Sequence, residues 1–260
     1  MRIVSLCPSL TELVFDLGLG EALVGITRYC VHPADRVGAI ESVGGTKDPD
    51  CERIVELAPD LVLVNSEENR LEDAEELEDA GLRLHASMPR TFEETAAMVR
   101  SIGQALDRAT EGETIAASIE ERAAAARIQA SQAEPVPFAY LIWKGPWMAA
   151  GVDTFASGLL ELAGGVNVFR ESEARYPTFE TESLRELAPR LVLLGSEPYP
   201  FAAHEAEALA AALDLPRDRV VLADGEYLSW HGSRTPDGID YAAALVRAAR
   251  TQPPESPQTC

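Results

Sequence analysis

Residues 52–67 read ERIVELAPDLVLVNSE, and residues 182–197 read ESLRELAPRLVLLGSE. The two segments are identical at ten of sixteen positions and begin half a chain length apart. Each segment predicts a short helix, a break at a proline and a buried strand of Leu and Val residues. A general preference for helix-Pro-strand units does not explain why Glu67 and Glu197 end the two strands in matching places. The repeat therefore predicts two halves built on one plan.

The rest of the chain alternates between predicted strands and helices. The first half opens with strand, helix and strand in RIVSLCPSLTELVFDLGLGEALVGIT, residues 2–27, and continues with a helix near 72–80, a strand near 82–86 and a helix at 91–106. The second half contains strands in FAYLIW (138–143) and RVVLAD (219–224) and a last helix in GIDYAAALVRAAR (238–250). This alternation predicts an α/β fold with parallel sheets.

One Ala-rich segment separates the two halves. Residues 112–134 lack an interior Pro or Gly and carry apolar residues at helical spacing, which predicts a single long helix. We expect an N-terminal α/β lobe at 1–111, the connecting helix at 112–134, a C-terminal α/β lobe at 135–250 and a disordered tail at 251–260. Ligands of open α/β sheets bind beyond the carboxyl ends of the strands, so two Rossmann-like lobes joined by a rigid helix predict a ligand cleft between the lobes.

Composition excludes several classes of partner. The formal net charge is −21 and the pI is about 4.5, which disfavours nucleic acid and anionic membrane surfaces. Hydrophobic residues make up 46% of the chain, enough for a substantial core, but no run approaches the ~18 apolar residues of a membrane span. We therefore expect a globular protein with neither nucleic-acid binding nor membrane insertion.

The N-terminus and the cysteines suggest a cellular location. The four cysteines form no CxxC motif and no dense disulfide framework, and Met1 leads into a strand without an export signal. If Met1 is the native start, these features predict a cytoplasmic protein. The alternative is a periplasmic or cell-surface protein whose export signal was trimmed.

Aromatic and charged residues gather in the loops that follow the predicted strands. Tryptophan and tyrosine in these loops suggest flat walls for a large ligand, although the same rings would also serve to pack the lobes together. Basic residues there are expected to meet ligand carboxylates or phosphate. The expected ligand-binding residues are Arg28, Tyr29, Lys47, Glu68, Arg70, Trp143, Trp147, Tyr176, Glu197, Tyr199, Trp230 and Arg234.

Three residues form a candidate metal site. Cys30 and His32 lie two apart in one loop, and His231 is expected in a facing loop, with Glu67, Glu68 and Glu197 as neighbours. Thiolate and imidazole together favour Zn or another soft metal, and any of the three side chains is a candidate axial ligand to a metal in a bound chelate.

Two catalytic patterns are incomplete. The segment SWHGS supplies Ser229, His231 and Ser233, with Asp224 nearby in sequence, but no G-x-S-x-G turn accompanies them. The segment VGGTK lacks the full phosphate-loop pattern. We therefore expect a protein that is not an enzyme.

The opening segment 2–27, the repeat at 52–64, the central helix and GVDTFASGLLELAGGVNVF (151–169) together resemble the substrate-binding proteins of class III ABC importers. This helical-backbone group includes cobalamin-binding and ferric-siderophore-binding receptors. The resemblance implies two lobes bridged by a rigid helix, a metal-chelate ligand such as a corrinoid, heme or ferric siderophore, and no obligatory cofactor beyond Co or Fe carried by that ligand.

The resemblance also implies an ABC permease as partner, docked through one surface glutamate per lobe. The first position falls near Leu71, with Glu72 adjacent, and the candidates in the second lobe are Glu205 and Glu207. The chain departs from the cobalamin receptor at Asn65, where that receptor has an aromatic residue, and in its missing export signal. Its loops are similar to those of a signal-less branch described as helical-backbone metal receptors.

A second hypothesis follows from that missing signal. The same fold serves in principle for a cytosolic metal-handling protein or enzyme with a Cys, His and Glu metal site. Metal analysis of protein purified without chelator separates the two hypotheses.

Overall fold

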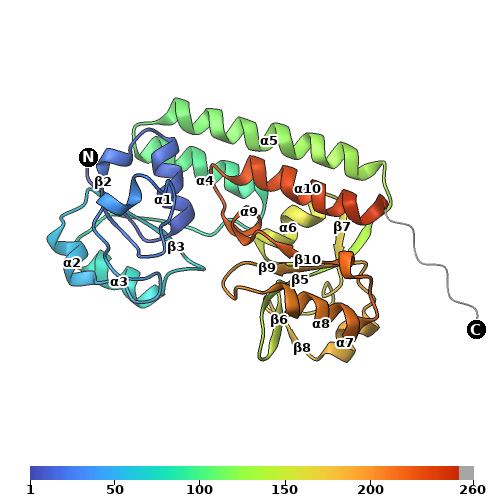
Figure 1. The fold of residues 1–260 in the computed structure, drawn as a ribbon. Helices are drawn as coiled ribbons and strands as arrows, with labels where there is room; N and C mark the ends of the chain where they lie inside the picture. The colour runs from blue at the N-terminus through green and yellow to red at the C-terminus, as the bar shows by residue number, and fades with distance from the viewer. Residues whose placement is uncertain (252–260) are drawn as a thin grey trace, which may run out of the picture. The chain divides into compact units, whose positions relative to one another are not determined.

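A computed structural model describes residues 1–251, and these form two compact α/β units (Figure 1). Unit 1 comprises Met1–Pro89, Glu93–Glu120 and Trp230–Thr235, and unit 2 comprises Arg90–Phe92, Glu121–Ser229 and the chain from Pro236 onward. The tail expected to be disordered lies, apart from Thr251, outside the described residues. Among the residues described, no helix combines the length and apolar character needed to cross a membrane.

Unit 1 is built on a four-stranded parallel sheet in the order β2-β1-β3-β4. Its strands are β1 (Ile3–Ser5), β2 (Leu23–Ile26), β3 (Leu61–Asn65) and β4 (Leu84–Ser87). Its helices are α1 (Pro8–Asp16), α2 (Cys51–Glu56), α3 (Leu71–Asp79), α4 (Phe92–Ala105) and the short 3-10 turns η1 (Gly20–Ala22) and η2 (Val37–Ala39). Every residue of β1 and β3 is buried, as expected for central parallel strands of Ile, Val and Leu.

Unit 2 contains a six-stranded sheet. Its strands are β5 (Val136–Trp143), β6 (Trp147–Ala149), β7 (Gly165–Asn167), β8 (Thr178–Phe179), β9 (Leu191–Gly195) and β10 (Val220–Ala223). Its helices are α6 (Phe155–Leu162), α7 (Thr181–Glu186), α8 (Ala203–Leu213), α9 (Gly225–Ser229), α10 (Thr235–Thr251) and the 3-10 turn η3 (Arg217–Arg219). The sheet order is β10-β9-β5-β6-β8, with β7 also paired to β5.

Each sheet contains four parallel strands in the same arrangement. β1 pairs with β3 so that Val4 lies opposite Val62, and β5 pairs with β9 so that Ala139 lies opposite Val192. The matching order is β2-β1-β3-β4 in unit 1 and β7-β5-β9-β10 in unit 2. The residue between repeat helix and strand has positive φ in both units, 44° at Ala58 and 47° at Ala188. The sequence repeat is therefore a structural repeat, and the predicted α/β class is confirmed.

The sheet of unit 2 differs from prediction because it is not wholly parallel. β6 and β8 are antiparallel additions beside the carboxyl half of β5. The turn at Gly145, with φ of 84°, reverses the chain between β5 and β6. A Gly-Pro pair between two tryptophans was the local signal for this hairpin.

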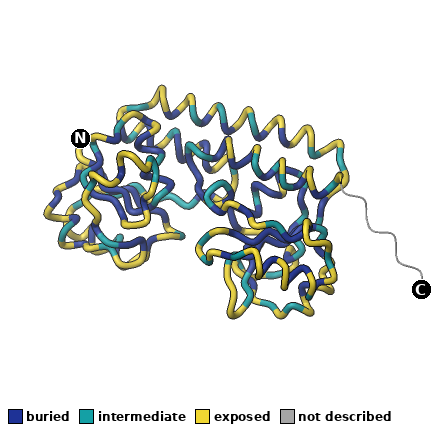
Figure 2. The backbone as a smooth tube through the Cα atoms, viewed as in Figure 1, coloured by how far each residue is buried: buried dark blue, intermediate teal, exposed yellow. Residues whose placement is uncertain are grey.

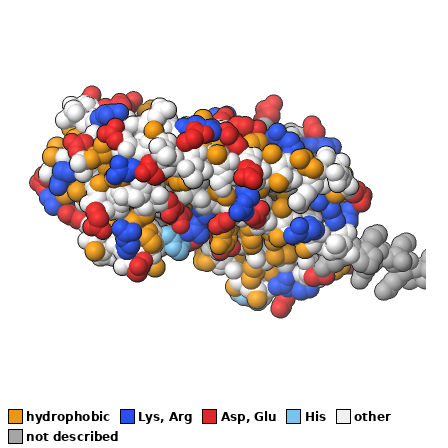
Figure 3. Space-filling model, turned by 90° about the horizontal axis from the view of Figure 1, so that it is seen from above, with side chains coloured by type: hydrophobic (Ala, Val, Ile, Leu, Met, Phe, Trp, Pro, Cys, Tyr) orange, Lys and Arg blue, Asp and Glu red, His pale blue; other side chains and the backbone are white. Residues whose placement is uncertain are grey.

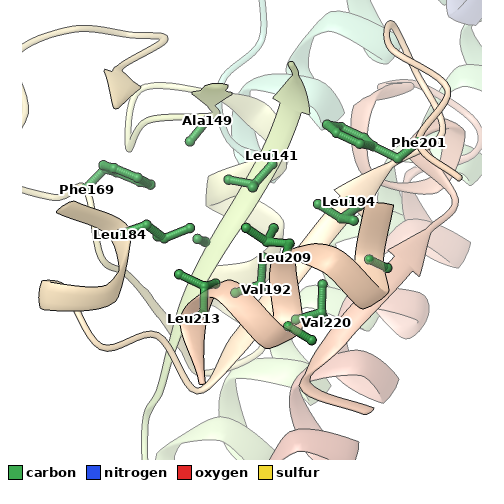
Figure 4. Packing of buried hydrophobic residues seen from close by; sticks show 13 residues of the cluster. Leu141, Ala149, Phe169, Leu184, Val192, Leu194, Phe201, Leu209, Leu213 and Val220 are labelled. Carbon is green, nitrogen blue, oxygen red and sulfur yellow. The ribbon is translucent and has the colours of Figure 1, made fainter. Parts of the chain in front are cut away.

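The core of each unit lies along its central strands, β1 and β3 in unit 1 and β5 and β9 in unit 2, and along the buried faces of the helices; Figure 2 draws such buried stretches in dark blue. In unit 2, side chains of β5 and β9 such as Leu141, Val192 and Leu194 pack against Leu209 and Leu213 of α8 (Figure 4). Phe201 lies near the arrowhead end of these strands in the same cluster. The core thus extends to the strand ends where ligands of such sheets bind.

Helix α5 spans Ala109–Ser131, three residues earlier at both ends than predicted. It begins in unit 1 and continues into unit 2 from Glu121. Close packing on α4 depends on two glycines, because a Cβ on Gly103 would lie 2.9 Å from the Arg108 carbonyl oxygen and 3.1 Å from Gly112 Cα. Residues 230–235, expected in the C-terminal lobe, belong instead to unit 1.

Candidate ligand-binding site

Hydroxyl and thiol groups fill the space beyond β1 and β2 in unit 1. The Thr11 hydroxyl donates to Ser5 Oγ at 2.9 Å and lies 3.0 Å from Cys30 Sγ. Thr27 Oγ1 lies 3.3 Å from the same sulfur. Burial raises the pKa of the Cys30 thiol, and it raises the pKa of Cys7 to about 12, with Glu68 adding to the effect. Both sulfurs therefore remain protonated thiols near neutral pH.

The predicted metal set of Cys30, His32 and His231 is not assembled. All three residues belong to unit 1, yet residues 1–251 contain no group of three or more His, Cys, Asp or Glu side chains placed to hold a metal ion. Metal binding by cysteine requires the thiolate, which the buried position of Cys30 disfavours. The His32 ring instead packs edge-on against Trp230, with ring centroids 5.4 Å apart.

Asn65, the last residue of β3, organises the loop that follows. Its Oδ1 accepts from the backbone N–H groups of Glu67 and Glu68 at 2.9 and 3.1 Å. Its Nδ2 therefore faces His231 Nε2 at 3.1 Å and donates to it. This contact assigns the imidazole proton to Nδ1 and holds His231, 8% exposed, at the strand end.

The basic residues expected to bind a ligand in unit 1 all have partners within that unit. Arg28 forms a two-oxygen pair with Asp48, and Arg70 forms one with Asp73. Further partners are Glu67, whose carbonyl oxygen accepts from Lys47 at 2.7 Å, and Glu12, which pairs with Arg234 at 2.6 Å.

Trp230, Glu68 and Tyr29 complete the predicted ligand-binding residues of unit 1. The Arg234 guanidinium lies 5.0 Å from the centroid of the Trp230 ring, which is only 7% exposed. Glu68 is exposed, and partial desolvation raises the pKa of its carboxyl group while nearby Lys47 opposes that rise. Tyr29 is 51% exposed and lies against Arg28. Among the predicted residues of unit 1, Tyr29 thus offers an exposed ring and Glu68 an exposed carboxylate, while Trp230 serves mainly in packing.

An aromatic cluster lies at the carboxyl ends of β5 and β9 and at the start of β6 in unit 2. Trp143 contacts Tyr199 edge-on at 5.7 Å, and Tyr199 contacts Phe201 at 4.7 Å. Trp147 stacks on Phe201 with an interplanar angle of 8°. We call Trp143, Trp147, Tyr199 and Phe201 the aromatic cluster. Trp143 is 41% exposed, so the cluster presents an open indole above a packed base.

Lys144 and Glu205 form an ion pair beneath this cluster. Lys144 Nζ donates to Glu205 Oε1 at 2.8 Å, and the Tyr199 hydroxyl donates to the same oxygen at 3.0 Å. The Ala202 N–H donates to Oε2 at 3.0 Å. These donors, the Lys144 ammonium above all, lower the pKa of Glu205 to about 2. Glu205 is therefore a fixed carboxylate whose negative charge is balanced by the Lys144 ammonium.

Glu205 is consequently not the exposed docking residue that the resemblance implied. Its side chain is 5% exposed, and both of its oxygens accept hydrogen bonds inside unit 2. The Glu205 carboxylate caps the start of α8 by accepting from the Ala202 N–H, so it is not available for docking. Glu72 lies exposed in the first turn of α3, and its docking role stays a prediction.

The two remaining predicted ligand-binding residues of unit 2 are Tyr176 and Glu197. Tyr176 is 37% exposed beside Arg175, whose guanidinium lies 5.8 Å from its ring centroid. Glu197 follows β9 and lies against α9, since a Cβ on Gly225 would fall 2.5 Å from Glu197 Cγ. Sequence reasoning missed Lys144 and Phe201 as site residues. Their positions in WKGPW and SEPYPF, next to predicted aromatics, were the available signal.

The chain belongs to the periplasmic binding protein family, because a family model described as "Periplasmic binding protein" matches residues 3–215. A vitamin B12-binding protein of Vibrio cholerae serotype O1 is 26% identical over 252 residues, which cover 96% of this chain and 91% of that protein. This confirms the expected class, that of the substrate-binding proteins.

Solved structures show the same fold. The periplasmic vitamin B12 binding protein BtuF of Vibrio cholerae matches with a TM-score of 0.83 at 24% identity, over 96% of this chain and 98% of that one. The periplasmic heme-binding protein RhuT from Roseiflexus sp. RS-1 matches with a TM-score of 0.83 at 26% identity, over 95% and 98%. These relatives are named for binding rather than for catalysis.

The prediction of a cytoplasmic location is wrong. It depended on Met1 being the native start, whereas the family and the matched structures are periplasmic binding proteins. The first residue of this chain is thus no guide to its compartment.

Proposed function

We propose that this protein is a non-catalytic receptor that binds a flat metal chelate of the corrinoid or heme type and delivers it to an ABC permease outside the cytoplasm. The aromatic cluster of unit 2 carries the proposal. The open face of Trp143, supported edge-on by Tyr199 and backed by stacked Trp147 and Phe201, suits a planar macrocycle. Relatives named for vitamin B12 and heme binding support the same ligand class.

Unit 1 carries polar groups at its own strand ends. Its exposed Glu68 carboxylate is an acceptor for ligand N–H groups, and exposed Tyr29 is an aromatic surface of that unit. His231 would serve as an axial ligand to a chelated metal only after its Nε2 releases the Asn65 amide, because that lone pair accepts the Asn65 N–H. Cobalt or iron would arrive with the ligand, so the protein itself needs no resident cofactor.

The test is an equilibrium titration of the purified chain with cyanocobalamin, heme and a ferric siderophore, followed by ligand absorbance and tryptophan fluorescence. Saturable binding of at least one planar chelate at one equivalent is expected. In Trp143→Ala that binding should weaken about tenfold, because ring stacking contributes beyond the area that it buries. Val55→Ala, an exposed change on α2, is the matched control.

Absence of a saturable change with every ligand contradicts the proposal. Equal affinities of the wild type and Trp143→Ala would show that the aromatic cluster does not contribute to ligand binding.

A further inference from the structure

Lys144 places a charged donor beside the aromatic cluster, within unit 2 alone. On the basis of the proposed function, we infer that Lys144 is a specificity-determining residue, which holds a carboxylate at the rim of the planar chelate while the ring lies on Trp143. The ammonium stays paired with Glu205 throughout, so this contact requires no bond of the free protein to break.

The ammonium is held at the base of the cluster by contacts on two sides. Lys144 Nζ lies 5.5 Å from the centroid of the Trp147 ring and donates to Glu205 Oε1 at 2.8 Å. The Tyr199 hydroxyl donates to the same oxygen at 3.0 Å, and the Tyr199 ring contacts the Trp143 ring at 5.7 Å. Trp143 directly precedes Lys144 in the chain. The ammonium and the open indole therefore belong to one small patch of unit 2.

The ammonium keeps donors for a ligand. A lysine ammonium has three N–H groups, and within the described part of the chain the Glu205 carboxylate takes one of them. The Lys144 side chain is 41% exposed, whereas that of Glu205 is 5% exposed. A ligand acceptor thus reaches the ammonium from solvent while Glu205 stays beneath it. The hydrogen bond to Glu205 also raises the pKa of Lys144, which keeps it charged near neutral pH.

Another cation of this protein already holds two carboxylates at once. Arg100 donates to Glu113 through Nε at 2.7 Å and to Glu120 through Nη1 at 2.6 Å. An ammonium bridges in the same way, with Glu205 on one side and a ligand carboxylate on the other. Because Glu205 does not have to leave, the ligand gains a charge-assisted hydrogen bond without displacing a partner.

The net charge of −21 does not prevent this contact. On the face shown in Figure 3, Lys and Arg side chains lie among Asp and Glu side chains, so charges of both signs meet at short range. At 0.15 M salt the screening length is about 8 Å, and exposed carboxylates beyond that distance have little effect. The groups at contact distance therefore decide the affinity for a ligand carboxylate, and beside the open indole Lys144 is such a group.

The patch matches a ligand that has a flat ring with a carboxylate at its rim. The ring stacks on Trp143, and the rim carboxylate accepts from Lys144. An ester or amide oxygen at the same place also accepts, but its hydrogen bond to a cation is weaker because the acceptor carries no charge. Unit 2 therefore favours a chelate with rim carboxylates over the same chelate with a neutral rim.

The experiment compares ferric heme with ferric heme dimethyl ester, which has the same ring and iron but no free carboxylate. Each is titrated at pH 7 in 0.15 M NaCl into the wild type, Lys144→Met/Glu205→Gln and Arg190→Gln, with ligand absorbance as the readout. The double variant removes the ammonium together with its partner, so the net charge is unchanged and no buried carboxylate loses its cation. Arg190→Gln is the control, because Arg190 precedes β9 at the end opposite to the aromatic cluster and pairs with Glu134.

The wild type should bind heme about tenfold more tightly than the ester, the gain expected for one charge-assisted hydrogen bond. In Lys144→Met/Glu205→Gln the two affinities should agree within about twofold, because heme loses that bond and the ester loses little. Arg190→Gln should keep the preference of the wild type. Lys144→Arg should keep part of it, since a guanidinium also donates to a carboxylate.

Equal binding of heme and its ester by the wild type overturns the inference, and so does a double variant that keeps the preference. An equal loss of both affinities in the double variant also overturns it, since Lys144 would then act only on the structure of the cluster. A wild type that binds cyanocobalamin but neither porphyrin overturns the inference and leaves the proposed function standing. Binding of none of the three chelates overturns the proposed function and the inference with it.

Discussion

The two units place different side chains at equivalent positions of one framework. Ser5 lies opposite Leu63 at the end of β1, and Tyr140 lies opposite Leu193 in β5. Asn65 ends β3, and Gly195 ends β9 at the matching position of the repeat. In unit 1 the small Ser5 leaves room for a network of hydroxyl and thiol groups, and Asn65 organises its loop. In unit 2 the Tyr140 ring occupies the corresponding space.

This difference separates what the framework requires from what the site requires. The buried Leu and Val residues of both repeats are interchangeable in kind because they only have to fill a sheet core. The residues at the strand ends are not interchangeable, because each depends on neighbours from other segments. One framework therefore carries a polar strand end in unit 1 and an aromatic one in unit 2.

Exchanging the residue at the end of the repeat should have the largest effect on stability. A Cβ at position 195 would lie 2.8 Å from the Tyr140 hydroxyl oxygen and 3.0 Å from the Glu197 carbonyl oxygen. Gly195→Asn should lower the free energy of unfolding by about 3 kcal/mol through overpacking. Urea denaturation followed by circular dichroism measures the loss. Gly38→Asn, at a glycine with open space around it, is the control, and an equal loss there would contradict the comparison.

The reverse exchange should cost less. Asn65→Gly removes the acceptor for two loop N–H groups and the donor to His231, and should lower the free energy of unfolding by about 2 kcal/mol. Asn65→Asp keeps the acceptor and loses the donor, so its loss should be smaller. A Gly variant as stable as the wild type would show that the Asn65 side chain does not organise unit 1.

The ion pair beneath the aromatic cluster predicts a smaller, pH-dependent effect. The pKa of Glu205 is lowered from 4.5 to about 2, so its contribution to stability is complete above about pH 4.5 and is lost as the pH falls toward about 2. Glu205→Gln should lower the free energy of unfolding at pH 7 by about 1 kcal/mol or less, because water screens the 41% exposed Lys144.

Urea denaturation of the wild type and Glu205→Gln at pH 7, 5 and 3 checks this prediction. The difference between them should be equal at pH 7 and 5 and reduced at pH 3. If the difference in the free energy of unfolding between the two proteins grew as the pH fell, it would contradict a stabilising Glu205 carboxylate with a lowered pKa.

The smallest effect is expected at the ion pairs along α5. Arg100 pairs with Glu113 and Glu120 in unit 1, and Arg122 pairs with Asp240 in unit 2. Arg100→Gln and Arg122→Gln should each shift the urea midpoint slightly, and the shifts should vanish at 1 M NaCl, where the screening length is about 3 Å. Shifts that survive high salt would indicate that these residues act through packing.

The fold was predictable because its signals are local. Helix breaks, buried Leu and Val runs and the Ala-rich segment lie in single stretches, and the repeat supplied the internal symmetry. The β6–β8 addition was missed because β8 is two residues long and is defined only by pairing with a distant strand. Residues 230–235 were placed in the wrong unit because strand-helix alternation does not show where a connecting segment packs.

The site was predictable as a set of residue types at strand ends, but not in the role of each residue. Glu205 was read as an exposed docking residue, yet it is 5% exposed and pairs with Lys144, 61 residues away. Cys30 and His231 were grouped as metal ligands from their chemistry, whereas Thr11 and Asn65 determine what each contacts. Such partners come from tertiary packing and leave no local pattern.

Binding of a planar metal chelate is the central claim, and equilibrium dialysis of the purified chain against cyanocobalamin and heme tests it most directly. The account predicts saturation at one equivalent of chelate per chain with at least one of the two ligands. Failure of both to bind, with the protein shown to be folded by circular dichroism, would contradict it.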